Sequence, residues 1–140
     1  MPERTANPDR FLHSTKTKYE FQFGYSRAIR HGSTIRVAGT AGLDERGVPV
    51  SDSAGDQAHR ALELIEAAIV DLGGTLADVI MTRIYVSDVH NIEAVAVIHG
   101  ERFRDIRPAT TIVKVDFVDP RILVEIEAEA VYGGAQEKKK

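Results

Sequence analysis

The sequence SAGDQAHRALELIEAAIVDLGGTLADVIMTRIYV, residues 53–86, joins a helical pattern to a strand pattern. Apolar side chains recur at steps of three and four residues over 58–72, which predicts a helix with one apolar face. Ser53 can cap the start of this helix, and Gly73-Gly74 supplies the left-handed backbone that ends helices. Val79–Val86 is rich in β-branched residues and predicts a strand. A helix with one apolar stripe next to a strand indicates a helix packed on a sheet.

The segments on either side of this stretch predict further strands and a second helix. A helix is expected over 91–103, and strands are expected at 19–23, 25–30, 34–38, 109–115 and 123–132. The resulting order, β-β-β-α-β-α-β-β, predicts a single α+β domain in which one mixed β-sheet carries two helices on one face. The helix-free face must then meet water or another subunit, and we expect an oligomer to cover it.

Composition restricts the class of protein. The 140 residues suit one domain, for which we expect a loose leader at 1–17, a folded part at 18–132 and a flexible tail at 133–140. The chain carries 18 Lys and Arg against 21 Asp and Glu, a net charge of −3 that argues against binding to nucleic acid. It has no cysteine, no apolar stretch long enough for a membrane helix and no cluster with metal-ligand spacing. We therefore expect a cytoplasmic protein with no metal and no membrane partner.

The last predicted strand carries an unusual row of negative charge. Glu125, Glu127 and Glu129 follow one another at two-residue steps, so their side chains lie on the same side of the strand. Like charges this close raise one another's pKa unless cations or water separate them. The row is either a solvated strand face or part of a cleft in which Glu125 or Glu127 acts as a general base.

Other candidate residues lie on separate predicted elements. Arg83 and Tyr85 share one side of their strand, where Arg83 either pairs with Glu125 or Glu127 or binds a substrate carboxylate. Arg27 shares one face with Tyr25 in the first hairpin, where it has a surface role or joins the site. His99 lies in the second helix and is either a packing histidine or a general acid and base.

Four segments resemble the RidA/YjgF/YER057c/UK114 family in order and spacing. They are VAGTAGLDERGVPV (37–50), LGGTLADVIMTRIYVSD (72–88), RPATTIVKV (107–115) and LVEIEAEA (123–130), and the resemblance extends over residues 22–132. It implies a chorismate-mutase-like α+β fold and a homotrimer with ligand clefts between neighbouring subunits. It also implies hydrolysis of enamines and imines, such as 2-aminoacrylate, to keto acid and ammonia without a metal or organic cofactor. In that chemistry a glutamate positions the attacking water and an arginine holds the substrate carboxylate.

Only some of the family's site residues are matched in this sequence. The water-holding glutamate falls on Glu125, and the aromatic residue at the cleft mouth falls on Tyr25. The carboxylate-binding arginine falls on Thr110, a residue whose hydroxyl cannot replace a guanidinium. Three other positions differ as well, and they are Ala38, Ala96 and Ile112. Either Arg83 or Arg27 binds the ligand instead, or the substrate is not a small 2-imino acid.

These observations give three hypotheses for function. The leading one is a hydrolase of imines or enamines in which Glu125 or Glu127 orients water, Arg83 binds an anion and His99 transfers protons; Tyr25, Thr110 and Thr111 then donate hydrogen bonds. The second is a protein that binds a small metabolite in the same cleft without catalysis. The third is an RNA-directed ribonuclease or translation inhibitor, against which the net charge of −3 argues.

Overall fold

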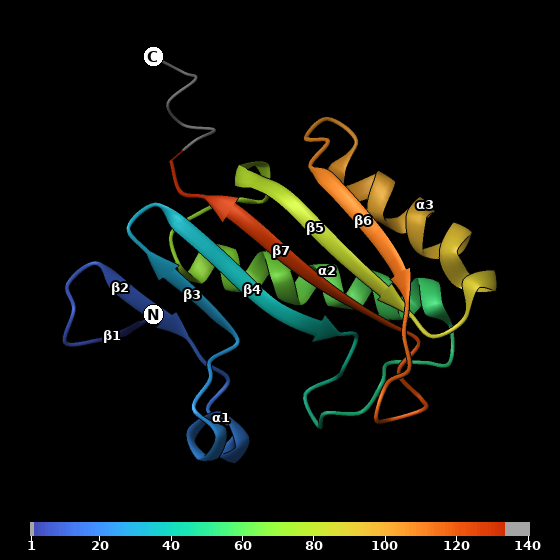
Figure 1. The fold of residues 1–140 in the computed structure, drawn as a ribbon, viewed down its shortest axis with the longest axis horizontal. Coiled ribbons are helices and arrows are strands. Elements are labelled where there is room, and N and C mark those ends of the chain that lie inside the picture. The colour runs from blue at the N-terminus through green and yellow to red at the C-terminus, as the bar shows by residue number, and fades with distance from the viewer. Residues whose placement is uncertain (1, 134–140) are drawn as a thin grey trace.

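A computed structural model describes residues 2–133, which form one seven-stranded sheet with helices behind it (Figure 1). The sheet order is β1-β2-β3-β4-β7-β5-β6, and β6 runs parallel to β5 while the other neighbours are antiparallel. The strands are β1 (Glu3–Arg4), β2 (Arg10–His13), β3 (Ala28–His31), β4 (Thr34–Ala41), β5 (Val79–Val86), β6 (Ala109–Lys114) and β7 (Val124–Val131). The helices are α1 (Lys18–Phe23), α2 (Ala54–Asp71) and α3 (Ile92–Phe103).

The helix α2 forms where the sequence predicts it. The Ser53 hydroxyl accepts a hydrogen bond from the Asp56 N–H at 3.3 Å, and Gly73 leaves the helix with φ +94°. The apolar stripe of α2, which includes the fully buried Ile65 and Ile69, packs against the sheet. Burial of side chains of this size contributes about 1.5–3 kcal/mol each. No helix within residues 2–133 combines the length and the apolar character that crossing a membrane requires.

Both long helices cover the same face of the sheet (Figure 1). The connection from β5 through α3 to the parallel strand β6 places α3 beside α2, and both pack over the buried side chains of the central strands. Two helices on one face of a mixed α+β sheet confirm the predicted fold class. The opposite face, which we call the open face, carries the alternate side chains of β4, β5 and β7, and no described helix lies on it.

The expected strand at 19–23 is wrong, because these residues form the helix α1. Thr17 and Glu20 make a capping box, in which each side chain bonds the other residue's backbone N–H. The Glu20 side chain is buried and accepts further hydrogen bonds from the hydroxyls of Ser14 and Thr15. Burial alone would raise the pKa of Glu20, but these hydrogen bonds outweigh burial and hold the pKa below its ordinary value. The alternation of aromatic residues therefore reflects exposed side chains of a short helix.

The expected loose leader is also wrong for residues 2–17. β2 pairs with β3, and β1 pairs with β2, so the leader extends the sheet by two strands. The imidazole of His13 contacts Asp71 at the end of α2, with 2.7 Å between Nδ1 and Oδ2. Phe11 packs against the core beneath the guanidinium of Arg30. A strand of four residues is too short to show periodicity, which is why the sequence pattern does not predict β2.

The expected flexible tail cannot be compared in full, because residues 134–140 lie outside the described part of the chain.

Candidate functional site

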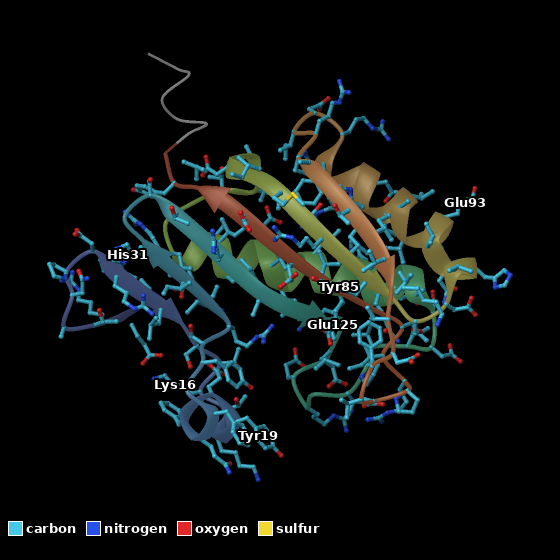
Figure 2. All side chains as sticks on the ribbon, viewed as in Figure 1. Lys16, Tyr19, His31, Tyr85, Glu93 and Glu125 are labelled. Carbon is cyan, nitrogen blue, oxygen red and sulfur yellow. The ribbon has the colours of Figure 1, made fainter. Side chains whose placement is uncertain are left out.

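The three glutamates of β7 lie together on the open face. Glu125, Glu127 and Glu129 alternate with buried residues that point to the helices, as the two-residue spacing predicts. Figure 2 shows Glu125 and Tyr85 side by side on the face turned away from α2, and their strands pair these two residues directly. The open face therefore carries a continuous row of carboxylates.

Two of these carboxylates already accept hydrogen bonds from side chains of the same protomer. Glu129 accepts a hydrogen bond from Arg83, with 3.0 Å between Nη1 and Oε1, and this bond is the main reason that the pKa of Arg83 is raised. Arg36 lies 4.0 Å from the same oxygen of Glu129. Glu127 accepts a hydrogen bond from the hydroxyl of Tyr85, and this bond is the main cause of the raised pKa of Tyr85. Arg83 thus forms an ion pair, which is one of the two alternatives that the sequence left open, but its partner is Glu129 and not the expected Glu125 or Glu127.

Glu125 differs from its two neighbours. Its carboxylate makes no hydrogen bond and no ion pair with any residue in the described range 2–133. Burial raises the pKa of Glu125; the charge of Arg27 opposes this shift, and the charge of Glu127 adds to it. A half-buried carboxylate without a partner and with a raised pKa has the properties of a general base.

A bulge in β4 brings Arg27 to the same place. The register between β4 and β7 shifts between Val37 and Thr40, so the backbone at Gly39 departs from regular pairing. Arg27 donates from Nη2 to the Gly39 carbonyl at 2.6 Å and to the Thr40 hydroxyl at 3.2 Å. Neither Gly39 nor Thr40 is among the site residues predicted from the sequence. A glycine inside a strand pattern, which often marks a bulge, is the signal that points to them.

His99 and Thr110 lie on the other face of the sheet. His99 Nε2 is 2.9 Å from the Thr82 hydroxyl, which is 2.7 Å from the Thr110 hydroxyl, and Thr110 donates to the carbonyl of Pro108. The hydrogen of the Thr110 hydroxyl is used on this carbonyl, so the Thr82 hydroxyl must donate to Thr110. His99 Nε2 must then donate to the Thr82 hydroxyl. Burial lowers the pKa of His99, whose ring packs against that of Phe103 at an interplanar angle of 36°, with centroids 4.6 Å apart.

The pleat of the sheet separates the predicted site residues into two groups. Within one protomer the structure brings together Glu125, Glu127, Arg83, Tyr85 and Arg27, and it does not bring His99 or Thr110 to them. Odd-numbered residues of β5 from Met81 to Tyr85 and those of β7 face one side, and Thr82 and its partners face the other. Thr111 is paired with Arg83 in the register and is exposed. Tyr25 follows the end of α1 and is 45% exposed.

No metal site is present in the described range. Residues 2–133 contain no group of three or more His, Asp or Glu side chains placed to hold a metal ion. A cleft of about 440 Å³ lies on the outer side of the helices, lined by residues such as Asp56, His59 and Ile98. None of the predicted site residues lines this cleft. The carboxylate row on the open face is therefore the candidate site.

The one-sided α+β sheet defines a protein of the YjgF fold. The chain belongs to the family described as endoribonuclease L-PSP, also called YjgF or Rid, which matches residues 16–132. A solved YjgF/YER057c/UK114 family protein from Mycobacterium tuberculosis, Rv2704, is 41% identical with a TM-score of 0.79, over 87% of this chain and 98% of its own. A solved Rid family protein of unknown function from Yersinia pestis is 28% identical with a TM-score of 0.72, over 76% of this chain and 86% of its own.

One relative has a name that specifies an activity. The 3-aminoacrylate deaminase RutC of Acinetobacter baylyi is 33% identical over 108 residues, which is 76% of this chain and 85% of that protein. Membership of the family confirms the resemblance on which the sequence-based expectations rest.

Proposed function

We propose that this protein is a hydrolase of small reactive enamines and imines that acts as a deaminase. The observation that carries the proposal is the Glu125 carboxylate, which is half buried, has a raised pKa and has no hydrogen-bond partner within residues 2–133. The relative named as a 3-aminoacrylate deaminase supports the same class of substrate. No metal or organic cofactor takes part in the proposed reaction.

The reaction adds water across a carbon–nitrogen double bond. Ionised Glu125 accepts a proton from water while the water oxygen attacks the imine carbon, and the imine nitrogen gains a proton from solvent. The resulting carbinolamine then expels ammonia. The proton held by Glu125 passes to the departing nitrogen, and the hydroxyl becomes a carbonyl by releasing its proton to solvent, which replaces the proton taken up by the imine nitrogen. One imine and one water thus give one carbonyl compound and one ammonia. A raised carboxyl pKa suits this cycle, because the group must both accept and return a proton.

We further propose that the protein is a homotrimer in which a neighbouring protomer closes each site. The open face carries the catalytic candidate but is not covered by any described helix. On α1, Tyr19, Phe21 and Phe23 are 52%, 69% and 66% exposed. Figure 2 shows Tyr19 on this helix, which lies beyond the end of the sheet. Exposed aromatic residues in a group are typical of contact surfaces. A cleft between protomers would exclude the bulk water that reaches Glu125 in a single chain.

Substitution of Glu125 tests the proposed reaction. We expect E125Q to lower ammonia release from 2-aminoacrylate, generated in the assay, by about 100-fold or more, because general bases contribute on the order of 10²–10⁴. Light scattering should show an unchanged assembly, since the glutamine has the same shape. E93Q, at an exposed position on α3, is the matched control and should keep full turnover. Undiminished turnover in E125Q would remove Glu125 from the mechanism.

A binding function without catalysis is the second candidate. The observation that favours it is Thr110, which stands where the family resemblance implies the carboxylate-binding arginine and whose hydroxyl is bonded to Thr82. Such a protein would bind a small metabolite at the same site and release it unchanged. Saturable binding of a ligand together with no ammonia release from any imine would favour this candidate over the hydrolase.

A further inference from the structure

The cleft of about 440 Å³ on the outer side of the helices combines apolar and charged side chains. Its apolar lining comes from Val50, in the loop 42–53, and from Ile98 of α3, and its charged lining includes Asp56, Arg60 and Glu63 of α2. A volume of this size and such a mixed lining are typical of sites for small molecules. None of these residues lies on the open face, so a ligand here is separate from the candidate catalytic site.

Asp56 and Arg60 line the same cleft one helical turn apart, yet they form no ion pair with each other. Opposite charges at positions i and i+4 of a helix are neighbours and ordinarily attract each other. Here the loop 42–53 holds them apart. The Ser51 hydroxyl donates to Asp56 Oδ2 at 3.0 Å, and Arg60 Nε donates to the Leu43 carbonyl at 2.9 Å. A negative and a positive group are therefore kept on one cleft without neutralising each other.

Both groups retain hydrogen-bonding capacity for a ligand. Asp56 Oδ1 accepts no hydrogen bond, and Arg60 Nη1 and Nη2 donate none, within residues 2–133. Glu63 lies 3.6 Å from Arg60 Nη1 and 3.8 Å from His59 Nε2, beyond the ordinary length of a hydrogen bond. The bond from Nε fixes the Arg60 guanidinium before any ligand arrives, which reduces the entropy lost on binding.

Gly55 keeps part of the cleft empty. It lies in the first turn of α2 with ordinary helical backbone, where alanine is the more favourable residue. A Cβ on Gly55 would meet only Ser53 Oγ at 3.8 Å and the Ile98 side chain at 3.9 Å, which are ordinary van der Waals contacts. Neither the backbone nor the packing requires a glycine here, whereas any larger residue would reduce the space beside Ile98.

We propose that this cleft binds a free α-amino acid with an aliphatic side chain. The ammonium group of the ligand donates to Asp56, and its carboxylate accepts hydrogen bonds from the Nη groups of Arg60. Cβ atoms one helical turn apart are separated by about 5–6 Å, a gap that two charged groups on one carbon can bridge with a hydrogen bond to each side. The aliphatic side chain packs against Val50 and Ile98. The proposal does not depend on the proposed hydrolase function.

Calorimetric titration with L-leucine and two truncated analogues tests the two charged contacts. Isocaproate lacks the ammonium group and isoamylamine lacks the carboxylate, while both keep the aliphatic chain. We expect L-leucine to bind about tenfold more tightly than either analogue, because each analogue loses one charge-assisted hydrogen bond. Equal affinity for the three probes, or no saturable binding of L-leucine up to about 10 mM, overturns the proposal.

Two variants assign the charged contacts to their residues. D56N, whose amide oxygen can still accept from the Ser51 hydroxyl, should lose the preference for L-leucine over isocaproate. R60Q should lose the preference for L-leucine over isoamylamine. D105N and R104Q remove exposed charges next to the end of α3 and are the matched controls, which should keep both preferences. Retention of either preference in the variant expected to lose it overturns the proposal.

The variant G55L tests the location of the ligand without removing a charge. Leucine is a good helix former, so urea unfolding should show a stability at least equal to that of the wild-type protein, while binding of L-leucine is lost. E125Q should bind L-leucine as the wild-type protein does, because Glu125 lies on the open face. Wild-type affinity in G55L, or lost binding in E125Q, would place the amino acid elsewhere and overturn the proposal. If G55L does not fold, D56N and R60Q decide the outcome.

Discussion

Gly39 lies against the Glu125 carboxylate so closely that a Cβ at residue 39 would stand 2.6 Å from Oε1. The contact joins the bulge of β4 to the row of carboxylates on β7. It determines where the candidate base sits, and a single methyl group is enough to displace it.

The substitution G39A should therefore impair turnover more than stability. The atom it would meet is the far end of a flexible side chain, which can move away at little cost, but the carboxylate then leaves its position beside Arg27. We expect a loss of turnover of about tenfold or more, since small displacements of catalytic groups have large effects on rate. G100A, on α3 with nothing within 4 Å of the new methyl group, is the control and should keep its activity. Equal activity of the two variants would contradict the placement of Glu125.

The variant E125Q should be more stable than the wild-type protein at neutral pH. Burial raises the pKa of Glu125 in the folded protein above its pKa in the unfolded chain. The protonated carboxyl therefore favours folding at pH values below the unfolded-state pKa, and this stabilisation is lost as the pH rises through the folded-state pKa. At pH 7 the ionised carboxylate thus opposes folding, and a neutral amide does not. Thermal unfolding should show a higher Tm for E125Q at pH 7 and a difference near zero at about pH 3.5. A lower Tm for E125Q at pH 7 would be the contrary result.

The variant Q57A should be strongly destabilised. Gln57 is fully buried on α2, and its amide bonds three backbone groups in two loops. Those groups are the carbonyls of Ser51 and Arg121 and the N–H of Leu123. Leaving such groups unpaired costs on the order of 3 kcal/mol in total. Urea unfolding at one fixed protein concentration measures the loss, and Q22A, at an exposed position on α1, should change little.

The variant H99Q should weaken the dependence of stability on pH. Burial lowers the pKa of His99, so the unfolded chain binds a proton more readily and stability falls as the pH drops below about 6.5. A glutamine can still donate to Thr82 and does not titrate. Urea unfolding at pH 7 and pH 5 should therefore show a smaller loss for H99Q than for the wild-type protein.

Turnover of H99Q measured on the same samples tests the predicted role of His99 in proton transfer. The structure places the imidazole on the helix-covered face, with its Nε2 donating to Thr82. We expect turnover to be retained within a few-fold. A loss of about 100-fold with normal stability would assign proton transfer to His99 instead.

Local patterns predicted the elements that local interactions stabilise. The strand at Val79–Val86 and the helix that begins after Ser53 form at the predicted residues, because alternation, helical periodicity and capping are contained within the segment itself. The error at α1 has the same origin. Thr17 and Glu20 have the spacing of a capping pair, but the alternation of aromatic and polar residues over 19–23 is typical of a strand. The strand β2 shows no local signal, since its partner β3 supplies its hydrogen bonds.

The sequence by itself determined the fold class and the placement of three glutamates on one side of the last strand, because side-chain alternation depends only on the local backbone. Tertiary structure decided which glutamate has no partner among residues 2–133. Tyr85 donates a hydrogen bond to Glu127 and Arg83 forms an ion pair with Glu129, while Glu125, against the bulge at Gly39, lies near Arg27 without an ion pair in that range. Tertiary structure also placed His99 behind the sheet. Such choices depend on register and on contacts between residues far apart in the chain, and no local pattern specifies them.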